Sequence, residues 1–380
     1  MAGFVPPPYP HDRLVGLKAA AEAVAGGMVD CSVGTPIDPM PELAIRALAD
    51  AAPGATGYPF SIGSLALREA AAAGLARRFE VHVDPATVIA CVGTKEMVAS
   101  LPRLLSLRDP TRDTVLYPAV SYPTYAMGAQ LAGLRAVPVP VDDEWRLDLA
   151  AVDPGDAGRA LVLWLNDPAN PTGVSATPAE IAASVAWARE RGIIVASDEC
   201  YAEFTYDESG RPAAPASALT SGPDGVLAVH SLSKRSNMAG LRVGFVAGET
   251  ELVRYLGEMR KHGGLIVPSP VQAAAVAALG DDDHVDEQRA RYAARRARLV
   301  PALASFGLVH DGGPSAFYLW LRVEAGEESG WSIAARLASV GTLVAPGDLY
   351  GPAGESHVRL AMTITDEQVD RMVERLAAVA

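Results

Sequence analysis

The sequence has few cysteines: Cys31, Cys91 and Cys200 are the three in 380 residues. An odd number of cysteines without paired metal-ligand spacing predicts neither a disulfide framework nor a zinc site. Such usage is typical of a reduced intracellular protein. We therefore expect no bound metal, and we interpret each cysteine as a small buried apolar residue.

Positive charge and long apolar runs are also scarce. Lysine and arginine number 32 against 45 aspartates and glutamates, and this net charge of −13 disfavours nucleic acid as a partner. No apolar run reaches membrane-spanning length, and the N-terminal PPPYPHDR does not resemble a signal peptide. We expect a cytoplasmic protein with no membrane contact, in which any bound anion is held by local groups.

Length and apolar content, by contrast, are sufficient for a large core, with 380 residues of which 49% are hydrophobic. Short apolar segments alternate with helical ones along the middle of the chain. The segments expected to form strands are TVIACVG, DTVLYP, RAVPV, ALVLWLN, GIIVASDE, VLAVHS and VGFVAG. This alternation predicts an α/β fold with a mostly parallel sheet covered by helices on both faces.

Helices are expected between these strands and beyond them. A capping box at Thr177–Glu180 predicts a helix that runs to about Arg191. Further helices are expected at 41–52, 65–79, 281–303, 333–340 and 368–378, and further strands in AFYLWLRV and HVRLAM. The five arginines within residues 281–303 are interpreted as a solvated helix face.

The chain is expected to divide into three parts. Residues 1–45 form an extended N-terminal arm with a glycine-containing loop, residues 46–280 a large domain, and residues 281–380 a small α+β domain packed with the arm.

Polar residues follow several predicted strands at the point where each strand ends. Gly93, Asn170, Asp198 and Ser231 occupy such positions. Because the carboxyl ends of parallel strands meet at one edge of a sheet, these residues should converge on one crevice.

One short stretch carries the most distinctive chemistry, HSLSKRSNMAGLRVGF at 230–245. It places Lys234 with Ser231, Ser233 and Arg242, which suits a nucleophilic amine beside a bound phosphate. A surface lysine in a polar loop is the alternative, because short motifs match by accident.

Four motifs occur in order: NPTG at 170–173, DExY at 198–201, SLSK at 231–234 and GLRVGF at 240–245. Together they resemble the class I/II aminotransferases, which are fold-type I enzymes dependent on pyridoxal 5′-phosphate (PLP). The resemblance covers nearly the whole chain. It implies that residues 46–280 are the PLP-binding domain and that amino groups are exchanged by a ping-pong mechanism.

The resemblance also implies a role for each site residue. Lys234 forms the Schiff base and moves protons, Asp198 pairs with the pyridine nitrogen, and Tyr201 and Asn170 donate to the ring oxygen. The phosphate is bound by the backbone around Gly93, Thr94 and Lys95, and by Ser231, Ser233 and Arg242. Tyr122 stacks on the ring, and Tyr58 reaches the phosphate of a second subunit in a homodimer. The substrate is bound by Gly34, Asn170, Lys95 and Arg359, of which Arg359 takes the α-carboxylate.

Each of these residues also has a structural interpretation. Asp198 is in a position to cap a helix, Asn170 suits a turn, and Tyr122 suits a core. Arg359 without the resemblance is an exposed arginine on an edge strand.

The substrate is predicted from a narrower resemblance. SKRSNMAGLRVGF, with LWLNDPANPTG upstream, is similar to bacterial N-succinyldiaminopimelate aminotransferases of lysine biosynthesis. This implies glutamate as amino donor and N-succinyl-2-amino-6-oxopimelate as acceptor, with Lys95 or Arg235 near the distal carboxylate. The same two residues also suit the exposed start of a helix. Aspartate, aromatic and LL-diaminopimelate aminotransferases remain open, as does a PLP-dependent C–S β-lyase.

Overall fold

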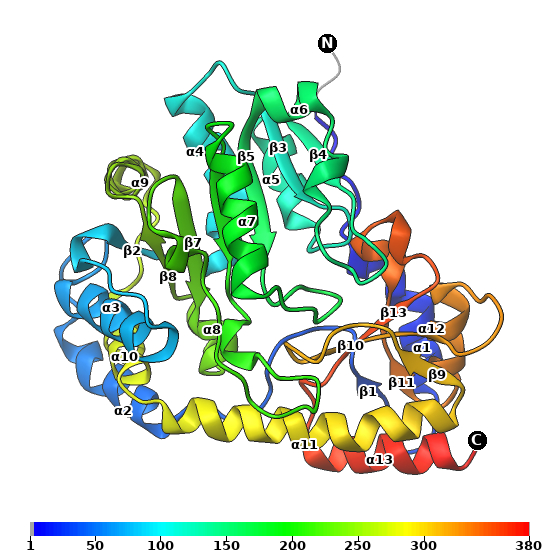
Figure 1. The fold of residues 1–380 in the computed structure, drawn as a ribbon. Coiled ribbons are helices and arrows are strands. Elements are labelled where there is room, and N and C mark those ends of the chain that lie inside the picture. Colours follow the sequence, from blue (N-terminus) through cyan, green and yellow to red (C-terminus); the bar gives the residue numbers. More distant parts are fainter. Residues whose placement is uncertain (1–3, 380) are drawn as a thin grey trace.

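The computed structural model describes residues 4–379, so residues 1–3 of the predicted arm lie outside the described part. A large sheet forms the centre of the molecule (Figure 1). Its order is β2 (Val88–Cys91), β8 (Gly244–Gly248), β7 (Val226–Ser231), β6 (Ile194–Asp198), β5 (Ala160–Asn166), β3 (Thr114–Pro118) and β4 (Arg135–Val139). All seven were predicted, and the sheet is mostly parallel because only β8 runs antiparallel to its neighbours β2 and β7.

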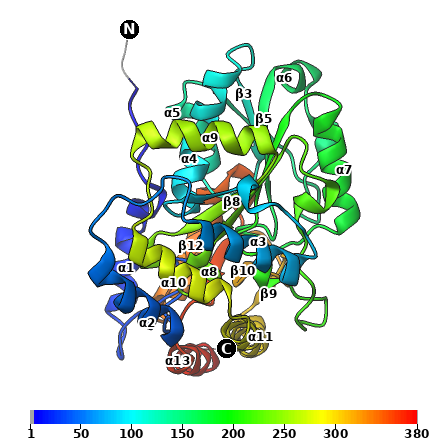
Figure 2. The ribbon, with the colours of Figure 1, turned by 90° about the vertical axis from the view of Figure 1, so that its left-hand side faces the viewer.

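Alternate side chains along the strands pack into two separate hydrophobic cores, one on each face of the sheet. On β5, Leu163 and Leu165 face one core, whereas Val162 and Trp164 face the other. The first core is shared with α3 (Leu65–Phe79), α7 (Pro178–Arg189) and α10 (Ser269–Leu279). The second is shared with α4 (Thr94–Arg108), α5 (Thr124–Leu131) and α9 (Thr250–Gly263), so helices cover both faces of the sheet (Figure 2).

Local signals set several helix bounds. The predicted capping box is present, since the Thr177 side chain accepts from Glu180 N and the Glu180 carboxylate accepts from Thr177 N. Ser64 caps α3 in a similar way, by accepting from Leu67 N. Three further helices are α2 (Glu42–Ala51), α6 (Pro154–Arg159) and α8 (Leu232–Arg235).

A second, antiparallel sheet lies beside the large one. Its order is β12 (Ala345–Pro346), β13 (Val358–Ala361), β10 (Tyr318–Val323) and β9 (Leu308–His310). Around it lie α11 (Asp283–Ser305), α12 (Gly330–Ser339) and α13 (Asp366–Ala377) (Figure 1). The division of the chain at residues 45 and 280 stays a prediction.

The N-terminal region differs from the extended arm that was expected. A helix, α1 (Val15–Glu22), forms there and packs on α12, and a short strand, β1 (Val29–Asp30), pairs parallel with β11 (Thr342–Leu343). The helix buries mainly a small residue, Ala21, against Ala338 and Leu343. Small buried residues leave little hydrophobic periodicity in a sequence, which is why the helix was not predicted.

The arginines of α11 were predicted to be solvated, and for two of them this is wrong. Arg289 is 8% exposed and Arg295 is 2% exposed. Arg295 binds both carboxylate oxygens of Asp38, at 2.7 and 2.8 Å, and Asp366 at 2.8 Å. A buried arginine needs an acidic partner. Because the partner here, Asp38, is distant in the sequence, the charge pattern around Arg295 does not reveal it.

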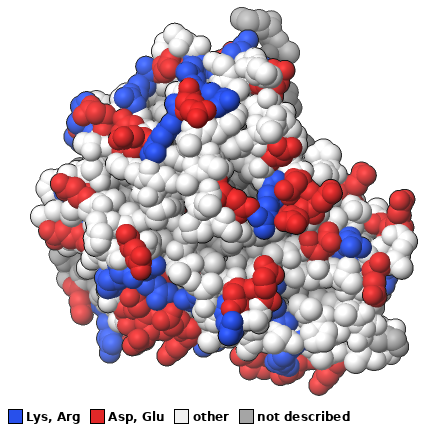
Figure 3. Space-filling view, in the orientation of Figure 1, with Lys and Arg blue, Asp and Glu red and all other residues white. Residues whose placement is uncertain are grey.

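Charged side chains of both signs are spread around the face shown in Figure 3, and a hollow with few of them lies across its middle. Within residues 4–379, no helix has the length and apolar character needed to span a bilayer. The same residues contain no group of three or more histidine, cysteine, aspartate or glutamate side chains placed to hold a metal ion.

Candidate active site

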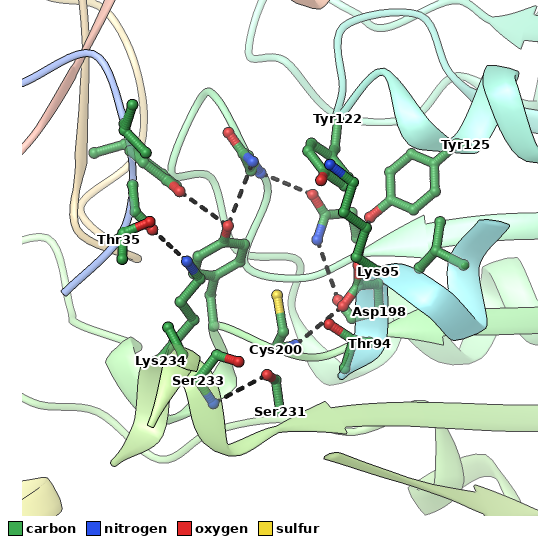
Figure 4. Close-up of a pocket in the computed structure, with 18 of the residues that line it drawn as sticks. Thr35, Thr94, Lys95, Tyr122, Tyr125, Asp198, Cys200, Ser231, Ser233 and Lys234 are labelled. Carbon is green, nitrogen blue, oxygen red and sulfur yellow. Dashed lines mark hydrogen bonds between the residues drawn. The ribbon is translucent and has the colours of Figure 1, made fainter. Parts of the chain in front are cut away.

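A cavity of about 260 Å³ lies at the carboxyl edge of the large sheet and collects most of the predicted site residues. Those that line it are Gly34, Thr94, Lys95, Tyr122, Asn170, Asp198, Tyr201, Ser231, Ser233, Lys234, Arg242 and Arg359. Figure 4 shows Cys200 between the side chains of Lys234 and Asp198 in this cavity.

Strand direction explains why these residues meet. The parallel strands β5, β6 and β7 end side by side, and Asn166 at the end of β5 is in register with Asp198 at the end of β6. Ser231 ends β7 and caps the short α8 by accepting from Ser233 N at 3.1 Å, so that Lys234 follows within one turn. Because β8 runs the other way, Arg242, two residues before its start, lies at the same edge.

Lys234 carries an amine in a desolvated setting. Burial lowers its pKa to about 8, and the nearby charges of Arg359 and Arg242 act in the same direction. The amine donates to the backbone carbonyl of Gly34. A free-base amine is the nucleophilic form, so this setting increases the fraction of Lys234 that is reactive near neutral pH.

Asp198 is a buried carboxylate, 4% exposed, on the other side of the cavity. Tyr125 Oη donates to its Oδ2 at 2.9 Å, and Cys200 N donates to its Oδ1 at 3.3 Å. Burial raises the pKa of Asp198. Within residues 4–379 it forms no salt bridge, which leaves it available to a cationic or N–H group of a ligand.

Arg359 is 4% exposed and belongs to β13, which lies between β12 and β10. The alternative of an exposed edge-strand arginine is therefore wrong. Its Nη1 donates to Asn170 Oδ1 at 3.0 Å and its Nη2 to the Ser32 carbonyl at 2.6 Å. Its buried Nε has no partner among the described residues. A planar cation held in this way suits a carboxylate.

A cradle for an anion lies where α4 begins. Gly93 is the N-cap of α4, with φ of +73°, and a Cβ there would overlap Nη2 of Arg242. The first amides of a helix bind anions, and the Ser231 and Ser233 hydroxyls line the same part of the cavity (Figure 4). The only hydrogen bond from the Arg242 guanidinium to another described residue goes to the Ala239 carbonyl, at 2.9 Å.

The side chain of Lys95 also lines the cavity and lies against two aromatic rings. Its amine is 5.0 Å from the ring centroid of Tyr9 and 5.8 Å from that of Tyr122. Burial opposes the charged form, but Tyr122 and Tyr9 raise the pKa of Lys95 overall. The amine therefore stays protonated at neutral pH and offers a cation to a ligand.

Two predicted residues lie elsewhere. Arg235, the alternative to Lys95, is 7% exposed and binds Glu203 at 3.1 Å and Asp282 at 3.0 Å, outside the cavity. Its proposed roles, reading a substrate carboxylate or lying exposed at a helix start, are both wrong. Tyr58 is fully exposed and is absent from the cavity lining, and its role toward a second subunit stays a prediction.

Several lining residues were missed by the sequence analysis: Tyr9, His11, Tyr125, Cys200 and Tyr318. Tyr318 lies in a run of apolar residues that are all buried, and such a run has the same pattern when its tyrosine belongs only to the core. Tyr9 and His11 precede the first helix, where no pattern signals a binding residue. Of the three cysteines, Cys31 and Cys91 are buried as expected, whereas Cys200 is only partly buried because it lines the cavity.

The residues present fit PLP. A desolvated amine, a buried carboxylate without a cationic partner and an arginine beside a helix N-terminus lie in one cavity. These correspond to the groups that a pyridine aldehyde with a phosphate requires: an amine, an acidic partner for the ring nitrogen and an anion site.

Comparison with known proteins agrees with this geometry. Residues 27–376 match the family described as aminotransferase class I and II. A probable aminotransferase of Mycobacterium tuberculosis is 47% identical, covering 97% of this chain and 85% of that protein. The 4-dedimethylamino-4-oxo-anhydrotetracycline transaminase OxyQ of Streptomyces rimosus is 44% identical, covering 97% and 99%. An LL-diaminopimelate aminotransferase of Desulforudis audaxviator is 36% identical, covering 97% and 95%.

Solved structures show the same architecture. Substrate-bound BacF from Bacillus subtilis superposes with a TM-score of 0.90 at 27% identity, covering 100% of this chain and 98% of that one. A probable N-succinyldiaminopimelate aminotransferase from Thermus thermophilus gives 0.86 at 30% identity, covering 97% and 99%. The predicted α/β fold of type I is confirmed. The chain belongs to the class I and II aminotransferases, a family of PLP-dependent enzymes.

Proposed function

We propose that this aminotransferase takes its amino group from glutamate and transfers it to an oxo acid with a distal carboxylate, best represented by N-succinyl-2-amino-6-oxopimelate. The observation that carries the proposal is the placement of two cations at different parts of one cavity. Arg359 lies beside Asn170 and Tyr201, and Lys95 lies beside Tyr9 and Tyr122. A substrate with two carboxylates has a partner for each.

Each site residue then has a role. Bound PLP supplies an electron sink for the pair of electrons left on the substrate Cα when its proton is removed. Lys234 removes and returns that proton, which its lowered pKa favours. Asp198 holds the ring nitrogen in its protonated form, and Tyr201 and Asn170 donate to the ring oxygen. Arg359 orients the α-carboxylate beside Gly34 and Asn170.

The remaining contacts hold the cofactor. We assign the phosphate to the amides of Gly93, Thr94 and Lys95, to the Ser231 and Ser233 hydroxyls, and to Arg242. Tyr122 is assigned to the ring face. The domain division at 45 and 280 belongs to the same proposal, since it places the cavity between a large and a small domain.

We also propose a homodimer in which Tyr58 completes the site of the second subunit. The support is an unusual concentration of exposed apolar side chains near the N-terminus: Phe4, Val5, Val33, Ile37, Ile45, Tyr58, Phe60 and Leu65. Exposed apolar side chains in such number suggest an interface, and Val33 adjoins Gly34 of the cavity.

The acceptor has a second candidate. The tetracycline transaminase of Streptomyces rimosus is 44% identical over nearly its whole length, which favours a cyclic ketone as an alternative. LL-diaminopimelate, aspartate and aromatic substrates, and a C–S β-lyase activity, are tested by the same assays. A β-lyase releases pyruvate and ammonia instead of exchanging amino groups.

The decisive experiment is an absorbance spectrum followed by an acceptor panel. Purified protein with PLP should show a visible cofactor band that glutamate bleaches, and absence of bleaching would refute glutamate as donor. The kcat/KM for N-succinyl-2-amino-6-oxopimelate should exceed that for oxaloacetate, phenylpyruvate and a cyclic ketone. Equal values for all four would refute the acceptor assignment.

A further inference from the structure

The hydroxyl of Tyr318 lies in the cavity and makes a hydrogen bond that has no role in the proposed function so far described. Tyr318 lies on β10, is 1% exposed, and its Oη is 2.9 Å from Oη of Tyr201. Among residues 4–379, Tyr201 is the only hydrogen-bond partner of this hydroxyl. A buried hydroxyl with a single partner has a defined orientation, so the direction of this bond matters.

The direction is constrained from the other end of the network. Arg359 Nη1 lies 3.0 Å from the Asn170 amide, and because arginine has only donors, the atom that faces it is the amide oxygen. Asn170 Nδ2 therefore faces Tyr201, and lies 3.4 Å from its hydroxyl. Since Nδ2 has no lone pair to offer, Tyr201 accepts from Asn170.

A tyrosine hydroxyl has one proton to donate and two lone pairs with which to accept. One lone pair of Tyr201 takes the Asn170 proton. If Tyr318 also donates, both lone pairs are used and the Tyr201 proton is left for the cavity. If Tyr201 donates to Tyr318 instead, no Tyr201 proton is available to a ligand.

We propose that Tyr318 is a positioning residue that donates to Tyr201, so that the Tyr201 proton is directed to the phenol oxygen of PLP. This inference rests on the proposed function of the cavity. It assigns to Tyr318 a role that acts through Tyr201 and does not require contact with the cofactor.

The surroundings of Tyr318 favour this direction. The Arg359 guanidinium lies 4.3 Å from the centroid of its ring, and a cation close to a phenol makes the phenol a stronger donor. Burial raises the pKa of Tyr318 to about 12, and Arg359 opposes that rise. Hydrogen bonds in series also strengthen one another, so donation by Tyr318 makes Tyr201 the better donor in turn.

Tyr350 provides a matched control. It also lies over Arg359, with its ring centroid 4.8 Å from the guanidinium carbon, and its hydroxyl is buried. That hydroxyl has no partner among the described residues. Tyr350→Phe therefore makes the same chemical change beside the same arginine, without removing a contact to Tyr201.

The test is a pH titration of the absorbance of bound PLP in wild type, Tyr318→Phe, Tyr350→Phe, Tyr201→Phe and the Tyr201→Phe/Tyr318→Phe double variant. A donor to the phenolate oxygen stabilises the deprotonated cofactor, so losing it raises the titration midpoint. We expect a rise of roughly half a pH unit in Tyr318→Phe, a larger rise in Tyr201→Phe, and no rise in Tyr350→Phe.

The double variant separates a positioning role from a general effect. Because Tyr318 acts through Tyr201, the double variant should titrate like Tyr201→Phe alone, and additive shifts would overturn the inference. KM for glutamate should change by less than about twofold in Tyr318→Phe, since the ring over Arg359 is retained.

The possible failures can be told apart. A wild-type protein without a cofactor band that glutamate bleaches would overturn the proposed function and this inference together. A normal wild-type titration with an unshifted Tyr318→Phe would overturn the inference alone. Circular dichroism of each variant checks the fold. If Tyr318→Phe does not fold, fluorotyrosine is incorporated at position 318 alone, and a titration midpoint that this more acidic phenol leaves unchanged overturns the inference.

Discussion

Gly93 and Arg242 lie so close together that a Cβ atom on Gly93 would overlap Nη2 of the Arg242 guanidinium. The glycine begins α4 and the arginine precedes β8, so two distant segments meet at the anion cradle. The absence of a side chain at position 93 therefore sets where the guanidinium can lie.

Gly93→Ala should weaken PLP binding roughly tenfold or more, because Arg242 must move away from the phosphate site. The measurement is the dissociation constant of PLP for the apoprotein. Gly133→Ala is the control, since Gly133 has a φ of +72° and nothing within 4 Å of its added Cβ. Alanine at position 133 has the same unfavourable positive φ as alanine at position 93, but it makes no contact with an arginine. Equal losses in the two variants would show that strain, and not Arg242, is responsible.

Lys234→Met should change the stability of the apoprotein in a pH-dependent way. The pKa of Lys234 is about 8 in the fold against an ordinary value of 10.5. The unfolded chain therefore binds more protons between those values, and wild-type stability gains with rising pH there. Below pH 8 the buried charge destabilises wild type, so the variant should be more stable at pH 7 by up to about 3 kcal/mol.

Urea unfolding of both apoproteins at pH 7 and pH 10 measures this difference, which should shrink at the higher pH. Lys261→Met is the control, because Lys261 is exposed and pairs with Glu258 on the same helix. A stability gap for Lys234→Met that stays constant from pH 7 to pH 10 would contradict the lowered pKa.

Lys95→Met should raise KM roughly tenfold for acceptors with a distal carboxylate and leave KM for phenylpyruvate nearly unchanged, because one charge-assisted hydrogen bond is lost. Steady-state kinetics on both acceptor types measures the difference, with Lys261→Met again as control. An equal rise in KM for both acceptors would show that Lys95 binds the cofactor phosphate and does not bind the distal carboxylate of the acceptor.

Tyr58→Ala should lower PLP affinity, because it removes a phosphate contact given by the second subunit. Mixing Tyr58→Ala with Lys234→Ala subunits, followed by partial unfolding and refolding, should raise turnover above that of either variant alone. In a mixed dimer, one site has both Lys234 and Tyr58. If mixing restores nothing while size-exclusion chromatography shows mixed dimers, Tyr58 does not act across an interface.

Arg295→Met should destabilise the fold by about 3 kcal/mol, because the buried Asp38 carboxylate loses both hydrogen bonds from Arg295 and keeps as a cation only the more distant Arg291, at 3.8 Å. Urea unfolding of the holoprotein measures the loss. Arg298→Met is the matched control on the same helix, since Arg298 is 41% exposed in its side chain and pairs with exposed Asp370. It should cost no more than about 0.5 kcal/mol. Similar losses of unfolding free energy in the two variants would mean that the burial of Arg295 adds nothing to the stability of the fold.

Much of the fold follows from the sequence because strand and helix signals are local. All strands of the large sheet and the capping box at Thr177 were predicted from patterns within ten residues or so. The helix at Val15–Glu22 was not, because its buried face consists of small residues that packing against α12 selects. Burial of Arg289 and Arg295 likewise depends on partners from other segments.

The site residues that could be predicted from sequence pattern are those that lie at the ends of strands. Asp198 and Ser231 follow from strand direction alone, whereas Arg359 comes from the other sheet and could be included only through family resemblance. Tyr318 was missed because an inward tyrosine on an apolar strand has the same pattern whether its hydroxyl is structural or functional. The link from Arg359 through Asn170 to Tyr201 is a three-dimensional relationship that no spacing encodes.

The reversed strand β8 has a consequence for how the site can assemble. Its antiparallel pairing with β7 makes a hairpin-like connection, so the amine of Lys234 and the guanidinium of Arg242 are only eight positions apart in the chain. Contacts of low sequence separation need little loop closure and form early in folding. Asp198 and Arg359 must instead be brought in over long separations. The chain is thus able to build the covalent anchor and its anion holder as one local unit, before the rest of the pocket closes around them.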